Sequence, residues 1–113
     1  MNWSYSSDID GEVAVMSLNG DLIGEKNGPS LIEGVNDCIN QKAKTGLIDI
    51  SNVRYMNSSG IGVLITVMTK FRNVGGDILL VNPSEHVKKL LLITKLNNIF
   101  NIYDSLEEAK ASL

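Results

Sequence analysis

The chain has 113 residues, of which 43% are hydrophobic and 20% charged, and its formal net charge at pH 7 is −3. These values are typical of a folded domain and not of a disordered chain, and the length suits a single domain that covers residues 1–113. The ten Lys and Arg residues are scattered, which argues against a basic stripe that binds nucleic acid.

Targeting and redox features of the sequence favour the cytoplasm. The N-terminal sequence MNWSYSSDID is polar and acidic, unlike a signal peptide. No apolar run approaches the roughly 20 residues that a bilayer span requires. Cys38 is the single cysteine, so we expect neither a disulfide framework nor a thiolate metal site. We therefore expect a cytoplasmic protein without direct membrane insertion.

Two strands are predicted at the start of the chain. Residues 12–18 (EVAVMSL) alternate between two faces, which predicts a buried strand that ends at the turn residues Asn19-Gly20. Residues 3–10 (WSYSSDID) predict a weaker edge strand, joined to the first through an Asp10-Gly11 hairpin turn.

A Gly-rich connection (DLIGEKNGP) is then expected to lead into an amphipathic helix. Pro29 suits the first turn of that helix, where a missing N–H group costs nothing. An apolar stripe follows, and the helix is predicted to end near Thr45-Gly46. The stripe consists of Leu31, Val35, Cys38 and Ile39, with Ile32 beside them.

A second strand and helix flank the sequence YMNSSGIG at residues 55–62. Residues 47–51 (LIDIS) predict a short strand. The segment IGVLITVMTKFRNVGG predicts a helix whose Val63 and Val67 lie outside the core-facing stripe, and Gly75-Gly76 predicts its end. The core-facing stripe consists of Ile61, Leu64, Ile65, Met68 and Phe71.

The last third of the chain predicts two more strands and two more helices. Residues 77–82 (DILLVN) are nearly all apolar, as in a strand covered on both faces. Asn82 is expected to cap the next helix, with Pro83 at its first position. Residues 99–104 (IFNIYD) predict a short strand, and the S-x-x-E box that begins at Ser105 predicts a capped C-terminal helix.

This order, β-β-α-β-α-β-α-β-α, indicates an α/β fold. Strands that alternate with helices require right-handed crossovers and therefore a mostly parallel sheet.

Signatures of catalysis are scarce. His86 is the single histidine and is expected to be a solvated surface residue, and one His with one Cys cannot form a usual metal site. Gly60 and Gly62 lack the third glycine of a dinucleotide fingerprint, and Ser59 does not lie between two glycines as in a nucleophile elbow. We predict no enzymatic activity, no catalytic residues, no metal and no cofactor.

The residues Asn57, Ser58 and Ser59 have two interpretations. Local physics favours capping, because any of the three side chains can accept a hydrogen bond from a free N–H group at a helix start. One cap needs only one residue, however, and Gly60 follows, which suggests backbone kept open to a partner. A phosphoryl group on a serine at a helix N-terminus would be tolerated by the fold, so one serine could be a switch.

Residues 47–109 resemble the STAS-domain anti-sigma-factor antagonists. The resemblance rests on the order of a strand, the NSSG sequence with its apolar helix, the paired-Gly turn and the LLVN strand. It continues through a V-x-x-x-L-x-x-T-x-L helix and the pattern IF…Y-x-S-x-E-E-A, and extends weakly to LNGDL at residues 18–22. Two positions differ from the usual pattern of the family, which has Asp in place of Asn57 and of Ile23.

The resemblance implies a mixed sheet of four to five strands with about four helices, largely on one side. It also implies a protein that binds an anti-sigma factor and so frees a sigma factor. That partner would be a serine kinase with the ATPase fold of histidine kinases. In the family the first hydroxyl before the glycine is phosphorylated, which corresponds to Ser58, and a PP2C-type phosphatase reverses the modification.

The same stretch suggests a contact surface for the partner. A phosphate of about −1.5 to −2 charges on Ser58 would then prevent docking without refolding the domain. The partner-binding residues predicted in this way are Asp21, Asn57, Ser58, Ser59, Gly60, Val63 and Val67.

Two alternatives of other classes remain open. The chain could be an accessory STAS subunit of an ABC-type membrane transport complex, which would dock permanently onto an ATPase. It could also be a small-ligand or nucleotide sensor that uses the helix start near Ser58 as an anion site.

Overall fold

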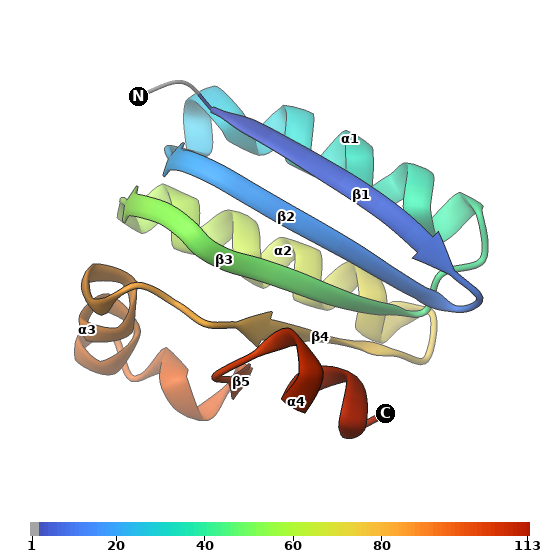
Figure 1. Cartoon of the computed structure of the whole chain (residues 1–113). Coiled ribbons are helices and arrows are strands. Elements are labelled where there is room, and N and C mark those ends of the chain that lie inside the picture. Colours follow the sequence, from blue (N-terminus) through green and yellow to red (C-terminus); the bar gives the residue numbers. More distant parts are fainter. Residues whose placement is uncertain (1–2) are drawn as a thin grey trace.

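The computed structural model describes residues 3–113 and contains one five-stranded sheet with helices on both faces (Figure 1). The strands are β1 (Ser4–Asp10), β2 (Val13–Leu22), β3 (Thr45–Met56), β4 (Asp77–Val81) and β5 (Asn101–Tyr103). The helices are α1 (Gly24–Asn40), α2 (Ser58–Asn73), α3 (Glu85–Ile93) and α4 (Leu106–Ala111), with a 3-10 turn at Leu96–Asn98.

The strands lie in the sheet in the order in which they occur in the chain. β1 is antiparallel to β2, whereas β2, β3, β4 and β5 are mutually parallel. The predicted order of elements and the mostly parallel, mixed sheet are therefore confirmed. β1 and β5 form the two edges of the sheet.

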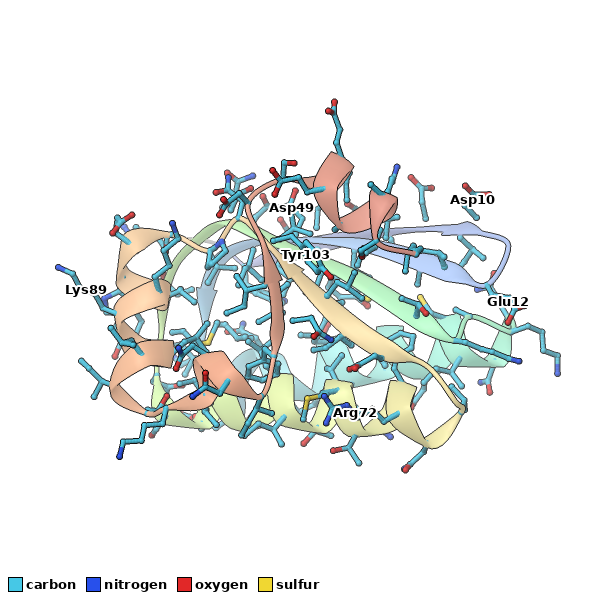
Figure 2. All side chains as sticks on the ribbon, turned by 90° about the horizontal axis from the view of Figure 1, so that it is seen from below. Asp10, Glu12, Asp49, Arg72, Lys89 and Tyr103 are labelled. Carbon is cyan, nitrogen blue, oxygen red and sulfur yellow. The ribbon has the colours of Figure 1, made fainter. Side chains whose placement is uncertain are left out.

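The helices divide unequally between the two faces of the sheet. α1, α2 and α3 pack on one face around the larger apolar core, which includes Leu31, Leu64 and Leu91. α4 covers part of the opposite face, where Ala109 packs on Leu47 and its neighbours. Figure 2 shows Asp49 and Tyr103 on the α4 side of the sheet and Arg72 on the α2 side. The expected arrangement of helices largely on one side is confirmed.

The loop of the first hairpin lies one residue later in the chain than predicted. Asp10 pairs with Val13, so the loop consists of Gly11 and Glu12 and not of Asp10-Gly11. Gly11 has φ +62°, a conformation that glycine adopts without steric cost and that two-residue hairpin loops require.

β2 and β3 are both longer than the sequence suggested. Asn19-Gly20 is not a turn: β2 continues to Leu22, and its pairing with β3 shifts register on both sides of this dipeptide. Gly20 has φ +100°, a conformation that a β-bulge can require. The glycine therefore allows the irregularity in β2 and does not mark a turn. β3 likewise runs through residues 52–56, beyond the predicted LIDIS strand.

The predicted start of α1 was wrong, because the helix begins at Gly24 and contains Pro29. In the first turns of α1 the buried face is formed by Gly24 and Gly28. Further along the helix the same face is formed by Leu31, Val35 and Cys38. A methyl group at Gly24 would overlap the backbone of Ser59, and one at Gly28 would lie 2.8 Å from Val63 Cγ2. The two glycines therefore let α1 approach α2 closely.

The helix caps agree with the predictions in part. Ser105 caps α4 by accepting a hydrogen bond from the Glu108 N–H group at 3.1 Å, as predicted. Asn82 does not cap α3; Ser84 accepts from the Val87 N–H group, while Asn82 has φ +50°. The prediction failed because Ser84, two residues later, is an equally good cap former.

Candidate functional site

The candidate site lies at one end of the sheet, where two parallel strands finish and two helices begin. β2 ends at Leu22 and β3 at Met56, and α1 and α2 start within two residues of these ends. Figure 1 shows the arrowheads of β2 and β3 and the first turns of α1 and α2 at the same end of the molecule. The carboxyl ends of parallel strands are where such folds gather functional side chains.

Asn57 joins the starts of the two helices. It has an extended backbone, and its side-chain Oδ1 accepts a hydrogen bond from the Gly60 N–H group at 2.8 Å, which caps α2. The same oxygen accepts from the Gly24 N–H group at 3.4 Å and lies 3.0 Å from the hydroxyl oxygen of Ser59. The capping interpretation is therefore confirmed for Asn57.

Ser59 is held by a carboxylate from α1. Its hydroxyl donates to Glu25 Oε2 at 2.5 Å, across 34 positions of sequence. This hydrogen bond is the main cause that lowers the pKa of Glu25 below its ordinary value, so Glu25 is an ionised acceptor at neutral pH. The contact thus fixes the Ser59 side chain toward α1.

Ser58 is the first residue of α2 and is exposed. Within the described residues 3–113, the hydroxyl group of Ser58 has no hydrogen-bond partner, in contrast to the hydroxyl of Ser59. The fold therefore uses Asn57 as the cap and leaves Ser58 at the surface.

Two of the predicted contact residues are buried. Val67 is only 1% exposed and belongs to the main core, so the prediction that it is exposed was wrong. α2 is covered by α1 as well as by the sheet, and its buried arc is wider than the predicted stripe. Gly60 is also buried, and a methyl group there would overlap the Leu22 carbonyl oxygen. Its glycine serves internal packing and does not keep the backbone open.

The remaining predicted contact residues lie nearer the surface. Val63 is partly exposed on α2. Asp21 on β2 is also partly exposed and forms an ion pair with Arg54, whose Nη2 lies 3.0 Å from Asp21 Oδ2. The hydrogen bond from Arg54 lowers the pKa of Asp21. Asp21 is thus a negatively charged group with a partner of its own.

Sequence reasoning missed Glu25 and Tyr55. Glu25 lay in the expected loop, and only the four-residue spacing of Gly24 and Gly28 hinted that a helix had already begun. Tyr55 is 43% exposed, and its ring packs against that of His86 with the centroids 5.1 Å apart and the planes tilted by 32°. His86 is exposed, as predicted.

Among residues 3–113, no group of three or more His, Cys, Asp or Glu side chains is placed to hold a metal ion. No helix in this range has both the length and the apolar composition of a membrane span.

The sequence is similar to those of known proteins. A protein of Thermotoga neapolitana, provisionally named an anti-sigma factor antagonist, is 38% identical over 63 residues, which are 56% of this chain. The matched segment also spans 56%, only about half, of the length of that relative.

Solved structures show the same fold over nearly the whole chain. The crystal structure of a provisionally named anti-sigma factor antagonist of Thermotoga maritima has a TM-score of 0.86 and 28% identity, covering 96% of this chain and 92% of the other. The unphosphorylated anti-sigma factor antagonist SpoIIAA has a TM-score of 0.78 and 24% identity, covering 94% and 92%, and supports the fold alone. The STAS domain family model matches residues 5–109, and the chain belongs to the STAS domain family.

Proposed function

We propose that this protein is an anti-sigma factor antagonist that binds an anti-sigma factor and loses this binding when Ser58 is phosphorylated. The observation that carries the proposal is the exposed Ser58 hydroxyl at the start of α2, left without a structural role by the Asn57 cap. The similarity to relatives that bear this name supports it.

The contact surface we propose is smaller than the sequence suggested. We define the switch face as Ser58, Ser59, Gly62 and Val63, with Asp21 at its rim. Gly62 is exposed, and an added methyl group would meet nothing within 4 Å, so a partner can approach the backbone of α2 there. Val67 and Gly60 are excluded because both are buried.

A phosphate at Ser58 would act through its charge. It adds about −1.5 to −2 charges, and burying such a group without a paired cation costs several kcal/mol. A loss of about 3–4 kcal/mol corresponds to roughly a hundredfold to a thousandfold loss of affinity. The Asn57 cap and the core beneath α2 remain intact, so no refolding is needed.

The proposed cycle involves two enzymes. The anti-sigma factor would itself be the serine kinase, with the ATPase fold of histidine kinases, and would phosphorylate the bound antagonist. A PP2C-type phosphatase would restore the active form. This role implies a cytoplasmic protein without catalytic activity of its own.

The test compares two substitutions at Ser58. We expect Ser58→Asp to weaken binding to the anti-sigma kinase encoded in the same genome by at least a hundredfold, because the carboxylate opposes docking. Ser58→Ala should bind as the wild type does and should carry no phosphate at residue 58. Isothermal titration calorimetry gives the affinities, and mass spectrometry after incubation with ATP gives the site.

The matched control is Ser30→Asp, which places the same charge on an exposed serine of α1. Equal affinity of Ser58→Asp and Ser30→Asp for the kinase would contradict the proposal. Stable co-purification with a transport ATPase and no phosphate would favour the accessory-subunit alternative. A ligand-dependent thermal shift would favour a sensor, although the Glu25 carboxylate beside Ser59 opposes binding of a free anion.

A further inference from the structure

We propose that Glu25 restricts phosphorylation to Ser58 by holding the hydroxyl group of the neighbouring Ser59. This inference rests on the proposed function and makes Glu25 a positioning residue that acts through Ser59. The chain offers a kinase two adjacent hydroxyl groups, and the structure treats them differently.

The contacts of Ser59 occupy its hydroxyl group. A serine hydroxyl has one proton, and Glu25 Oε2 at 2.5 Å is a closer acceptor than Asn57 Oδ1 at 3.0 Å. A hydrogen bond to an ionised carboxylate is stronger than one to a neutral amide, so the proton lies toward Glu25. The lowered pKa of Glu25 is consistent with this assignment, because hydrogen bonding to the ionised form favours that form.

The packing of α1 reinforces the difference. Gly24 lies against the backbone carbonyl and the Cβ atom of Ser59, so closely that a methyl group on Gly24 would overlap both. Glu25 follows Gly24 directly and is therefore fixed beside Ser59 by the start of α1. Both serines are exposed, but the hydroxyl group of Ser58 makes no hydrogen bond to any described residue, whereas that of Ser59 does.

The chemistry of phosphoryl transfer explains why these contacts matter. Transfer from ATP forms a bond between the serine Oγ and the γ-phosphorus, breaks the bond from that phosphorus to the β–γ bridging oxygen, and releases ADP. The hydroxyl proton passes to a base of the kinase.

Ser59 meets two obstacles in this reaction. Its proton is already engaged by Glu25, so its Oγ must break a charge-assisted hydrogen bond before it can turn toward the kinase. The Glu25 carboxylate would also repel the incoming triphosphate. Ser58 does not meet the first obstacle, because its hydroxyl group makes no hydrogen bond to a described residue, and we expect it to be preferred by roughly tenfold or more.

The first experiment needs no kinase. In an equal mixture of H2O and D2O, the 13Cβ NMR signal of a serine splits when its hydroxyl proton exchanges slowly. We expect a split signal for Ser59 and a single signal for Ser58 in the wild type. Glu25→Ala should make the Ser59 signal single, whereas the control Glu33→Ala, at an exposed position of the same helix, should leave it split. An unsplit Ser59 signal in the wild type would overturn the inference.

The second experiment measures phosphorylation by the same anti-sigma kinase with ATP. In Ser58→Ala we expect Ser59 to be phosphorylated at no more than about a tenth of the rate at Ser58 in the wild type. In the double variant Ser58→Ala/Glu25→Ala we expect Ser59 to be phosphorylated at least tenfold faster than in Ser58→Ala. Ser58→Ala/Glu33→Ala should behave like Ser58→Ala. Circular dichroism and thermal melting would establish that each variant folds.

The outcomes separate the two proposals. Wild-type protein phosphorylated on Ser58, together with a double variant that stays unphosphorylated, would overturn the role of Glu25 alone. Wild-type protein that accepts no phosphate would overturn the proposed function, while the 13Cβ signal would still decide whether Glu25 holds Ser59.

Discussion

Three consecutive polar side chains at the start of α2 have three different environments. The Asn57 side chain accepts from the backbone of both α1 and α2, the Ser59 hydroxyl donates to Glu25, and Ser58 is exposed. Asn57 caps α2 and Ser59 bridges to α1, which leaves the hydroxyl group of Ser58 available for chemistry.

The pKa of Glu25 gives a test at the scale of a single residue. Ser59→Ala removes the hydrogen bond that chiefly lowers this pKa, which should therefore rise toward the ordinary value of 4.5. An NMR titration of the side-chain carboxyl carbon would measure the change. Asp21 is the internal control. Its pKa is lowered mainly by Arg54, so Ser59→Ala should leave the pKa of Asp21 unchanged.

The lowered pKa of Glu25 also predicts how the stability of the protein depends on pH, which unfolding experiments can measure. The pKa of Glu25 is lower in the folded than in the unfolded chain, so ionised Glu25 stabilises the fold above the unfolded value and loses this effect as the pH falls through the folded value. The stability advantage of wild type over Ser59→Ala should be constant near neutral pH and shrink below pH 4.5. An advantage that grows on acidification would contradict the assignment.

At the scale of elements, glycines decide how closely α1 and α2 approach. Gly24→Ala should destabilise the protein by about 1–3 kcal/mol, because the added methyl group overlaps the Ser59 backbone, which cannot move aside as a flexible side chain could. Gly62→Ala lies in the exposed part of α2 with open space around it, and should stabilise by about 0.5–1 kcal/mol through helix propensity. Urea denaturation measures both, and effects of the same sign would contradict this account of the packing.

The elements that the sequence predicted well are those with strong local patterns. The apolar run DILLV became the buried strand β4, and the S-x-x-E box at Ser105 became the cap of α4. The exposed Ser58 was also within reach of sequence reasoning, because a helix start could be located next to it.

The errors arose where packing between elements replaces a local signal. The first turns of α1 use Gly24 and Gly28 on the buried face, and glycine looks like a loop residue in sequence. Val67 was taken as exposed because the second covering layer, α1, is not visible in the pattern of α2. The contact of Glu25 with Ser59 joins positions 34 residues apart, and no short motif encodes it.

At the scale of the whole molecule, we predict that residues 1–113 unfold as one cooperative domain. Leu80→Ala removes a fully buried side chain from β4 and should cost about 2–5 kcal/mol. Leu92→Ala removes a side chain that is 64% exposed on α3 and should change stability by less than about 0.5 kcal/mol. Far-UV circular dichroism and the fluorescence of Trp3, the single tryptophan, should report coincident transitions in urea. Separate transitions would contradict a single domain.

The two edges of the sheet have a consequence for how copies of the protein behave together. β1 ends in a charged segment with exposed Asp8 and Asp10, and β5 is only three residues long. Charged or very short outer strands resist the backbone pairing through which sheets of separate molecules merge into fibres. At high concentration the protein should therefore stay dispersed, because the sheet edges of separate copies do not pair.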